Sequence, residues 1–384
     1  MPTPPTLDIA LRNNTSSDTV YAYVTGRAID HNNAWFLLQR DGRTPYYPFP
    51  PSQDGAPLEQ DCAVRLGPPG STITVTVPHL AGARIWVSVD KELIFKLNRG
   101  PALVEPSATN PSDPNINTNW GFAEFTYNDW EVFANITYVD FVSVPMSLSL
   151  TSTTGATQHV AGIPANGLDM ICAWLRAQDL RDNAGWSSLI VYQNGRNLRV
   201  LSPNLGMVMN PLLFQDYYKP YVDLCYQRWA TTTLSVNTQG SAGVINGTVV
   251  NGVLVLGSHV FSKPSAGDIF SCNTGPFAHT GDITRDNLSA RLSAGFNRST
   301  LHVDDTIPDS PPVYFDHPIT NHYARIVHEV NLDGRGYAFP YDDVGPVDGM
   351  DQSGAVRHWS PKVLTVGIGG NGASAIGRGI RAEL

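Results

Sequence analysis

Residues 121–142 read GFAEFTYNDWEVFANITYVDFV. Most of this stretch is apolar on both sides of a polar turn near residue 130, which predicts two antiparallel strands of a hairpin. Glu124 and Asp140 nevertheless stand inside the two predicted strands, among Phe, Tyr, Val and Ile. An ionised carboxylate on an apolar face is costly unless it is paired or solvated. The stretch therefore predicts a sheet with one open face, which meets either ordinary solvent or a cleft.

Further short strands surround this hairpin in the first 160 residues, separated by Pro, Gly, Asn and Asp. Short strands at regular spacing are typical of a β-sandwich or barrel. Residues 104–119 are rich in proline and are expected to form a surface loop, because proline cannot donate a hydrogen bond to a strand ladder. The other predicted strands are LDIALRN, AYVTGRAI, AWFLLQR, STITVTV, ARIWVSV, LIFKLN and MSLSLTST.

The pattern changes near residue 165, where helical spacing of apolar residues begins. Pro220 is expected to kink or split one of the helices, because proline lacks the backbone N–H. Strand-like segments lie between the helices, and Asn-Gly pairs at 246–247 and 251–252 predict hairpin turns. The predicted helices cover residues 167–180, 212–230, 286–297 and 319–331.

The end of the chain returns to strands and turns, as in KVLTVGIGG. A chain of 384 residues suits two domains. We therefore predict a mainly β fold with an α/β domain. Residues 1–160 form a β domain completed by about 331–384, and residues 161–330 form an inserted, mixed α/β domain. Two domains in series are the alternative.

The amino-acid composition limits the classes of partner that this protein is expected to bind. Charged residues make up 15% of the chain, against about 25% in typical soluble proteins, so neutral polar groups must cover the surface. With 34 Gly and 29 Pro, the chain resembles loop-rich secreted β proteins. A net charge of −9 without a Lys/Arg cluster argues against nucleic acid and anionic membranes. We expect a monomer that binds a neutral or cationic ligand.

The N-terminus MPTPPTLDIALRNN has no apolar segment of the kind found in signal peptides. Either a signal was removed or the protein is cytosolic, and the composition favours secretion. No apolar run approaches about 18 residues, so no transmembrane helix is predicted.

Four cysteines occur, an even number that permits two disulfides in three connectivities. Their spacing does not suggest a zinc site, so we interpret them as disulfides or as buried thiols. They are Cys62, Cys172, Cys225 and Cys272.

Two carboxylates in one hairpin suit acid/base catalysis, as in glycoside hydrolysis. Inverting enzymes hold the pair roughly 6.5–9.5 Å apart and retaining enzymes roughly 5–5.5 Å. A symmetric hairpin turning near residue 130 would place Glu124 opposite residue 136. Asp140 would then lie roughly 13 Å further along the strand, at about 3.3 Å per residue. This geometry disfavours retention, and it permits inversion only if the strands coil or bulge. The alternative is that one carboxylate simply faces solvent or bonds a turn.

The hairpin resembles a known family. EFTYN at 124–128 and FANITYVDFV at 133–142, followed by Pro145, resemble the catalytic hairpin of glycoside hydrolase family 64. Its members are endo-β-1,3-glucanases of the laminaripentaose-producing type. YAFPYDD at 337–343 resembles a stretch of thaumatin-like proteins, whose β domain this family shares, although those proteins carry many more cysteines. The resemblance implies a thaumatin-like β domain, an inserted α/β domain and a wide cleft between them.

The resemblance also implies roles for individual residues. Glu124 matches the general acid and Asp140 the general base, with inversion at the anomeric carbon. Phe133 stands where related sequences tend to carry Trp, so stacking on a sugar is expected to be weaker there. Trp130 in the turn either stacks on a sugar or is an exposed loop aromatic. The expected substrate-binding residues are Thr126, Asn128, Trp130, Phe133, Asp113, Asp342 and Asp343, and turn capping is the alternative for the three aspartates.

We therefore expect endo-acting hydrolysis of a β-1,3-glucan such as laminarin or curdlan. The expected products are short laminari-oligosaccharides, with the pentaose foremost. Acid/base hydrolysis calls for no metal or other cofactor. The alternative is a non-catalytic thaumatin-like protein that binds β-glucan in defence. Both readings predict glucan affinity, but only the enzyme releases oligosaccharides.

Overall fold

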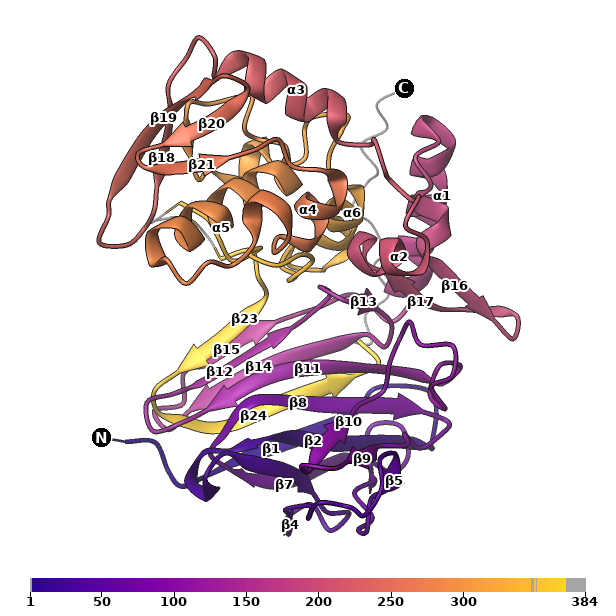
Figure 1. The fold of residues 1–384 in the computed structure, drawn as a ribbon. Helices are drawn as coiled ribbons and strands as arrows, with labels where there is room; N and C mark the ends of the chain where they lie inside the picture. Colours follow the sequence, from indigo (N-terminus) through magenta and orange to yellow (C-terminus); the bar gives the residue numbers. More distant parts are fainter. Residues whose placement is uncertain (1, 347–348, 350, 371–384) are drawn as a thin grey trace.

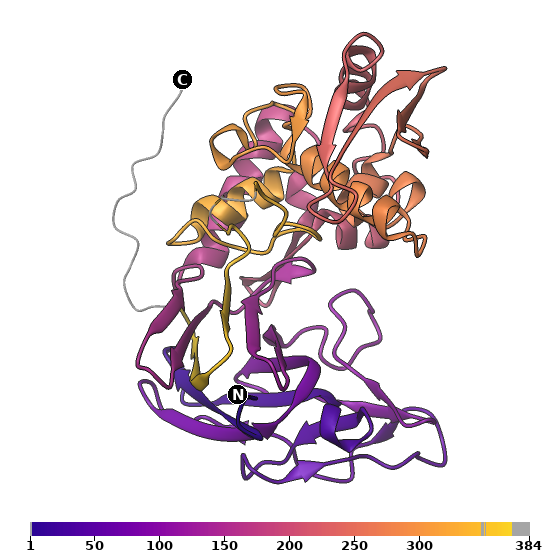
Figure 2. The same cartoon turned by 90° about the vertical axis from the view of Figure 1, so that its left-hand side faces the viewer.

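The structure is a computed structural model that describes residues 2–346, 349 and 351–370. Figures 1 and 2 show a lower part built of strands and an upper part that holds the helices. The lower part comes from the first 160 residues and from the segment near the end of the chain. The predicted completion of the β domain extends to residue 384, and its residues 371–384 lie outside the described residues.

Two large sheets make up the lower part. The first has the order β23–β12–β11–β8–β2–β3–β4, with β6 also paired to β2, and the second has the order β15–β14–β24–β1–β7. A small sheet, β10–β9–β5, lies beside them. The mainly β character predicted from the sequence is confirmed. The strands are β1 (Thr6–Asn13), β2 (Val20–Ala28), β3 (Ala34–Leu38), β4 (Pro45–Tyr46), β5 (Ala56–Pro57), β6 (Val64–Arg65), β7 (Thr72–Pro78), β8 (Leu80–Val89), β9 (Lys96–Asn98), β10 (Ala102–Val104), β11 (Asn119–Tyr127), β12 (Val132–Ile136), β14 (Met146–Ser152), β15 (Thr157–Val160), β23 (Ala355–His358) and β24 (Pro361–Ile368).

A strand from the end of the chain is central to the second sheet. β24 lies between β14 and β1, parallel to β1 and antiparallel to β14. The sheet is therefore complete only when the segment after the helices has returned to it. The tail of the chain thus contributes β24 to the second sheet and β23 to the first.

Alternation along β11 separates the two faces of the first sheet. Ala123, Phe125 and Tyr127 are buried in the cluster that both large sheets share. Phe122 and Glu124 point to the other face, because neighbouring residues in a strand face opposite sides. This outer face bears Glu124, one of the two carboxylates that the hairpin pattern singled out.

Six α-helices of the described chain occupy the upper part: α1 (Gly167–Asp182), α2 (Pro203–Met209), α3 (Lys219–Arg228), α4 (Ala266–Ser271), α5 (Ile283–Arg298) and α6 (His322–Val330). Three of the four predicted helices are confirmed as α1, α5 and α6. The fourth is shorter than predicted, because α3 begins at Lys219 and residues 212–218 form turns. Pro220 lies in the first turn of α3, where its missing N–H would have no partner within the helix anyway.

A five-stranded sheet with the order β21–β20–β19–β18–β22 completes the upper part. Asn251 and Gly252 form the predicted turn between β19 and β20, with φ of 52° and 82°. The turn predicted at residues 246–247 does not form, because Asn246 and Gly247 lie within β19. Glycine is needed there for space, since a Cβ at Gly247 would lie 2.0 Å from the carbonyl oxygen of Val255. The strands are β18 (Leu234–Asn237), β19 (Val244–Val250), β20 (Val253–Leu256), β21 (His259–Phe261) and β22 (Thr306–Ile307).

A three-stranded sheet connects the two parts in the order β13–β17–β16. Its first strand, β13 (Phe141–Val142), follows the hairpin and pairs with β17 (Arg196–Leu201) of the upper part, next to β16 (Ile190–Gln193). The chain therefore leaves the first sheet after Ile136, pairs with the upper part at Phe141 and Val142, and returns to the second sheet of the lower part in β14.

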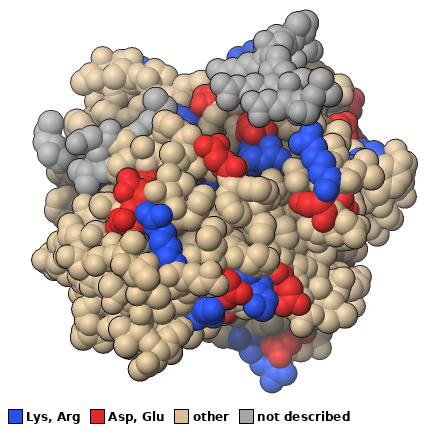
Figure 3. All heavy atoms as spheres, turned by 90° about the horizontal axis from the view of Figure 1, so that it is seen from above, with Lys and Arg blue, Asp and Glu red and all other residues tan. Residues whose placement is uncertain are grey.

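All four cysteines are buried free thiols, so the disulfide alternative is not realised. No helix of the described residues is both long and apolar enough to cross a membrane. Figure 3 shows the upper face of the molecule, where uncharged residues cover most of the surface and acidic and basic groups lie next to one another. Where described residues form this face, they show no large patch of a single sign of the kind that binds nucleic acid.

Candidate active site

The predicted hairpin exists, but its register differs from the symmetric one. Glu124 pairs with Asn135, not with residue 136. β12 ends at Ile136, and Asp140 lies in a bend before β13. The symmetric register and the continuous strand on which the estimate of roughly 13 Å rested are therefore wrong, because the chain leaves the sheet between the two carboxylates.

A polar row crosses the outer face of the first sheet at Glu124. The neighbours of Glu124 in register are Arg84 on β8 and Asn135 on β12, and Arg84 in turn pairs with Thr25 on β2. The next row toward the start of β11 is aromatic and buried, with Tyr23, Trp86 and Phe122. The polar row therefore marks the place where the buried aromatic cover ends.

Arg84 holds two carboxylates at this place. Its Nε donates to Oε1 of Glu124 at 3.2 Å, and a terminal nitrogen donates to Oε2 of Glu105 at 2.7 Å. The guanidinium also lies 4.6 Å from the centroid of the Phe122 ring. All three charged side chains are partly exposed, with 37% of Glu124 accessible. Glu124 is thus tied to the sheet and still reaches solvent.

Asp140 lies at the junction of the two parts. Its backbone oxygen accepts a hydrogen bond from the N–H of Ser202 at 2.8 Å, which ties it to the upper part. Burial raises the pKa of the Asp140 carboxyl, and the positive charge of Arg84 partly opposes this. Asp140 and Glu124 therefore lie within the field of one arginine.

A cavity of about 630 Å³ opens at the Glu124–Asn135 end of the polar row. It contains three of the predicted site residues, Glu124, Phe133 and Asp343. The segment between α6 and β23 forms one wall, where the backbone oxygen of Tyr337 accepts from the N–H of Tyr138 at 2.7 Å. The lining residues are Glu124, Phe133, Asn135, Gln158, Arg335, Tyr337, Asp343, Asp351, Ser353, Ala355 and Arg357.

The predicted residues around the hairpin turn differ in what they offer. Thr126 lies on the same face as Glu124, opposite Phe133. The side-chain oxygen of Asn128 accepts from the N–H groups of Trp130 and Glu131, at 2.9 and 3.1 Å. Asn128 therefore closes the turn, and this bonding occupies its amide oxygen. Trp130 is 80% exposed, and Phe133 is 39% exposed at the cavity.

Asp113 caps the loop before β11. Its two carboxylate oxygens accept from the N–H groups of Ser107 and Asn115, at 3.1 and 2.7 Å. Only 9% of the residue is exposed, and it is not part of the cavity lining. Asp113 therefore caps a turn, which was the alternative to substrate binding.

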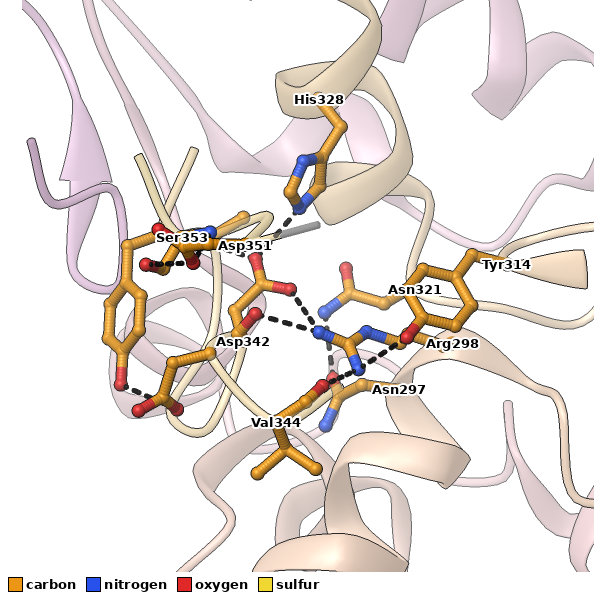
Figure 4. Close-up of polar contacts among 12 residues, drawn as sticks. Asn297, Arg298, Tyr314, Asn321, His328, Asp342, Val344, Asp351 and Ser353 are labelled. Carbon is orange, nitrogen blue, oxygen red and sulfur yellow. Dashed lines mark hydrogen bonds and ion pairs between the residues drawn. The ribbon is translucent and has the colours of Figure 1, made fainter. Parts of the chain in front are cut away.

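Asp342 and Asp343 differ in exposure. Asp343 is exposed and lines the cavity. Asp342 is 1% exposed, and its carboxylate accepts from Arg298 at 3.0 Å and from His328 Nε2 at 2.8 Å (Figure 4). A third bond comes from the N–H of Ala338 at 2.9 Å. Asp342 therefore has a structural role, so we leave it out of the proposed substrate-contacting set.

Electrostatics within this buried group favour the charged forms. Burial alone would raise the pKa of the Asp342 carboxyl, but His328 and Arg298 hold it below its usual value. Burial alone would lower the pKa of His328, but Asp342 raises it. The group fixes the loop that carries Tyr337 and Asp343 into the cavity.

Sequence reasoning missed two charged residues of the site, Arg84 and Glu105. Arg84 had a local signal of the same kind as Glu124, because it is the one charged residue in the apolar strand ARIWVSV. Glu105 had none, since it lies in the Pro-rich loop before the hairpin, where no strand pattern indicates which way a side chain points. No group of three or more His, Cys, Asp or Glu arranged to hold a metal ion occurs among the described residues.

The family model for β-1,3-glucanases of glycoside hydrolase family 64 matches residues 5–368. The chain belongs to glycoside hydrolase family 64. The resemblance predicted from the hairpin is thereby confirmed.

Individual family 64 relatives give the same picture. The chain is 26% identical over 362 residues to a glucan endo-1,3-beta-glucosidase of Arthrobacter sp. (strain YCWD3), and equally to one of Cellulosimicrobium cellulans. Each match covers 91% of this chain and 64% of the relative. The chain therefore spans less than two thirds of the length of these curated relatives.

Solved structures of family 64 also share the fold. A laminaripentaose-producing β-1,3-glucanase in complex with laminaritetraose superimposes with a TM-score of 0.85 and 28% identity. That match covers 95% of this chain and 99% of the other. A family 64 domain from Clostridium beijerinckii matches with a TM-score of 0.73 and 19% identity, covering 95% and 98%. At that identity the second likeness speaks for the fold alone.

Proposed function

We propose that this chain is an endo-acting glycoside hydrolase that cleaves β-1,3-glucan with inversion of the anomeric configuration. The observation that carries the proposal is the place of Glu124. It lies half-exposed on the floor of a cavity beside an accessible aromatic ring, Phe133. The C–H groups of a glucose ring give it faces that can pack on such an aromatic surface, and its glycosidic oxygen would then lie near the carboxyl group.

The proposed reaction needs two proton transfers. Asp140 takes a proton from water as the water oxygen bonds to the anomeric carbon. Glu124 gives its proton to the glycosidic oxygen as the bond between that oxygen and the anomeric carbon breaks. Both carboxyl groups end in the opposite protonation state, and exchange with solvent resets them. Inversion requires room for the water, which a separation of roughly 6.5–9.5 Å supplies.

The substrate-contacting set in this proposal is smaller than the one the sequence implied. Phe133 would stack on a sugar, and Asp343 would bind hydroxyl groups from the opposite wall. Thr126 would bind sugar hydroxyls beside Glu124, and exposed Trp130 would extend the binding face. One solved relative is named for producing laminaripentaose, and we propose laminari-oligosaccharides around the pentaose as the products.

We propose further properties on the same basis. The protein would act outside the cell as a monomer. The β part would be thaumatin-like, formed by residues 1–160 and about 331–384, with residues 161–330 inserted as an α/β domain. The glucan would lie in a cleft between the two.

The test is proton NMR of the anomeric signals released from laminarin in the first minutes of reaction. An α-anomer that later mutarotates supports inversion, whereas a first β-anomer contradicts it. Glu124→Gln and Asp140→Asn should each lower kcat by about 10²–10⁴-fold. Glu59→Gln, at an exposed glutamate outside the cavity lining, should keep the wild-type rate. Glucan binding without any release of oligosaccharide would favour the non-catalytic alternative.

A further inference from the structure

The contact between Arg84 and Glu124 raises a problem for the proposed mechanism. A guanidinium 3.2 Å from a carboxylate favours the negative form of that carboxylate. A general acid, however, has to start the reaction protonated. Something at the site must therefore offset the charge of Arg84.

Glu105 is placed to do this. It accepts from Arg84 at 2.7 Å, a shorter contact than the one between Arg84 and Glu124. Its other carboxylate oxygen lies 3.4 Å from the hydroxyl of Thr25, which itself accepts from the indole N–H of Trp86 at 2.9 Å. The Glu105 carboxylate is thus held from two sides, behind the arginine.

We propose that Glu105 is a positioning residue that holds Arg84 and offsets its charge, which lets Glu124 carry the proton for general acid catalysis. This inference rests on the proposed function and adds Arg84 and Glu105 to its machinery. Burial raises the pKa of Glu105, and Arg84 opposes the rise. Glu105 thus depends on Arg84 for its negative charge, as a member of one shared charge group.

Among the described residues around the cavity, the other ion pairs are separate from Arg84. Arg335 pairs with Asp351 at 3.5 Å, and Arg357 pairs with Glu131, so both of these arginines have carboxylates of their own. Among the described residues, the titratable and charged groups around Glu124 are its ion-pair partner Arg84 from β8, Glu105 from the loop after β10, Asp140 before β13, which also feels the charge of Arg84, and, across the cavity, Arg335, Tyr337, Asp343, Asp351 and Arg357.

If Glu105 offsets the charge of Arg84, replacing either residue should shift the pH profile of kcat/KM in a defined direction. Glu105→Gln keeps the shape of the side chain but leaves Arg84 with Glu124 as its carboxylate partner. The ionised form of Glu124 is then favoured, so the alkaline limb of kcat/KM should move down by about one pH unit. Arg84→Met should move the same limb up, because two carboxylates then lie together without a cation. Arg84→Met/Glu105→Gln should restore the limb to near its wild-type position.

The experiment measures laminarin hydrolysis by the full chain across both limbs of the profile. Glu105→Asp, which keeps the charge, should retain a limb closer to wild type than Glu105→Gln does. The matched control is Asp61→Asn, which removes the carboxylate 3.0 Å from Arg40 in an exposed ion pair and should leave both limbs unmoved. Thermal unfolding of each variant shows that it is folded, and Arg84→Met tests the same charge relation if Glu105→Gln does not fold.

The outcomes separate the inference from the proposed function. If Glu124→Gln is inactive and Glu105→Gln lowers activity equally at every pH, Glu105 is merely structural and the inference is wrong. If Glu124→Gln keeps wild-type activity, the proposed function of Glu124 fails, and the inference falls with it. Opposite shifts in Glu105→Gln and Arg84→Met establish the shared charge group.

Discussion

The two neighbouring aspartates at the end of YAFPYDD offer a sharp test of the structure. The sequence treats Asp342 and Asp343 alike, but the structure buries the first and exposes the second. We predict that Asp342→Asn mainly destabilises the fold, whereas Asp343→Asn mainly impairs activity. The two substitutions are chemically identical and adjacent, so each serves as the control for the other.

The expected loss of stability in Asp342→Asn follows from the contacts that the Asp342 carboxylate makes. Asp342→Asn leaves the buried guanidinium of Arg298 without its countercharge and removes the partner of His328 (Figure 4). Arg298 retains the carbonyl oxygens of Asp342 and Val344 and the hydroxyl of Tyr314 as acceptors, but none of these is charged. Breaking a buried ion pair by removing one partner costs about 3–5 kcal/mol. Asp343 accepts one long contact from the Tyr337 hydroxyl at 3.4 Å, so its loss should cost less than about 0.5 kcal/mol.

The stability that the Asp342–His328 contact provides depends on pH, and the pKa shifts of the two residues set the direction of this dependence. The pKa of His328 is raised, so the free energy of unfolding that it contributes is fully present below about pH 6.5. This contribution is lost as the pH rises through the raised pKa. The pKa of Asp342 is lowered, so its contribution is present above about pH 3.9 and is lost as the pH falls through the lowered value. The difference between wild type and Asp342→Asn should therefore be largest between about pH 4 and 6.5.

Urea unfolding in that pH window is the assay. With an m-value near or above about 3 kcal/mol/M for a chain of this size, the midpoint of Asp342→Asn should fall by about 1 M. The midpoint of Asp343→Asn should not move measurably, while its kcat/KM on laminarin should drop. Midpoints that fall equally in the two variants, or a loss under about 1 kcal/mol in Asp342→Asn, would refute the assignment of Asp342 as a buried structural charge.

Three further predictions concern the hairpin. Phe133→Ala should raise KM for laminarin about 2- to 12-fold, from the loss of an aromatic contact of about 0.5–1.5 kcal/mol, while Phe133→Trp should not raise it; steady-state kinetics of the pair decides. Asn128→Ala should lower the free energy of unfolding by about 1–2 kcal/mol, because two turn N–H groups lose their acceptor. KM should stay unchanged, and a raised KM with unchanged stability would show that Asn128 binds substrate. The pKa of Asp140 is raised by burial, and the proposed base must be ionised, so the acid limb of kcat/KM should have its midpoint above about pH 3.9; a midpoint at or below that value would contradict the assignment.

Much of the fold could be predicted because it depends on local patterns. The alternation of apolar and polar residues in β11 and β12 separates a core face from an outer face, whichever strands lie beside them. The helical spacing in α1, α5 and α6 is equally local. The Asn-Gly pair at 246–247 misled the prediction because the same dipeptide serves a turn or a close strand approach. Only the neighbouring strand, with the Val255 carbonyl oxygen 2.0 Å from a would-be Cβ of Gly247, distinguishes the two.

The site divides in the same way. The amino-acid pattern predicts that Glu124 lies on the outer face of a sheet and that the hairpin belongs to a glucanase family, because both follow from residues adjacent in the chain. The pattern does not predict that Glu124 shares Arg84 with Glu105, or that Asp342 is buried while Asp343 lines the cavity. These facts depend on strand register and on loops that return from distant parts of the chain. Whether a carboxylate meets solvent, a backbone N–H or a guanidinium is a property of its neighbours in space, and those neighbours are set by packing.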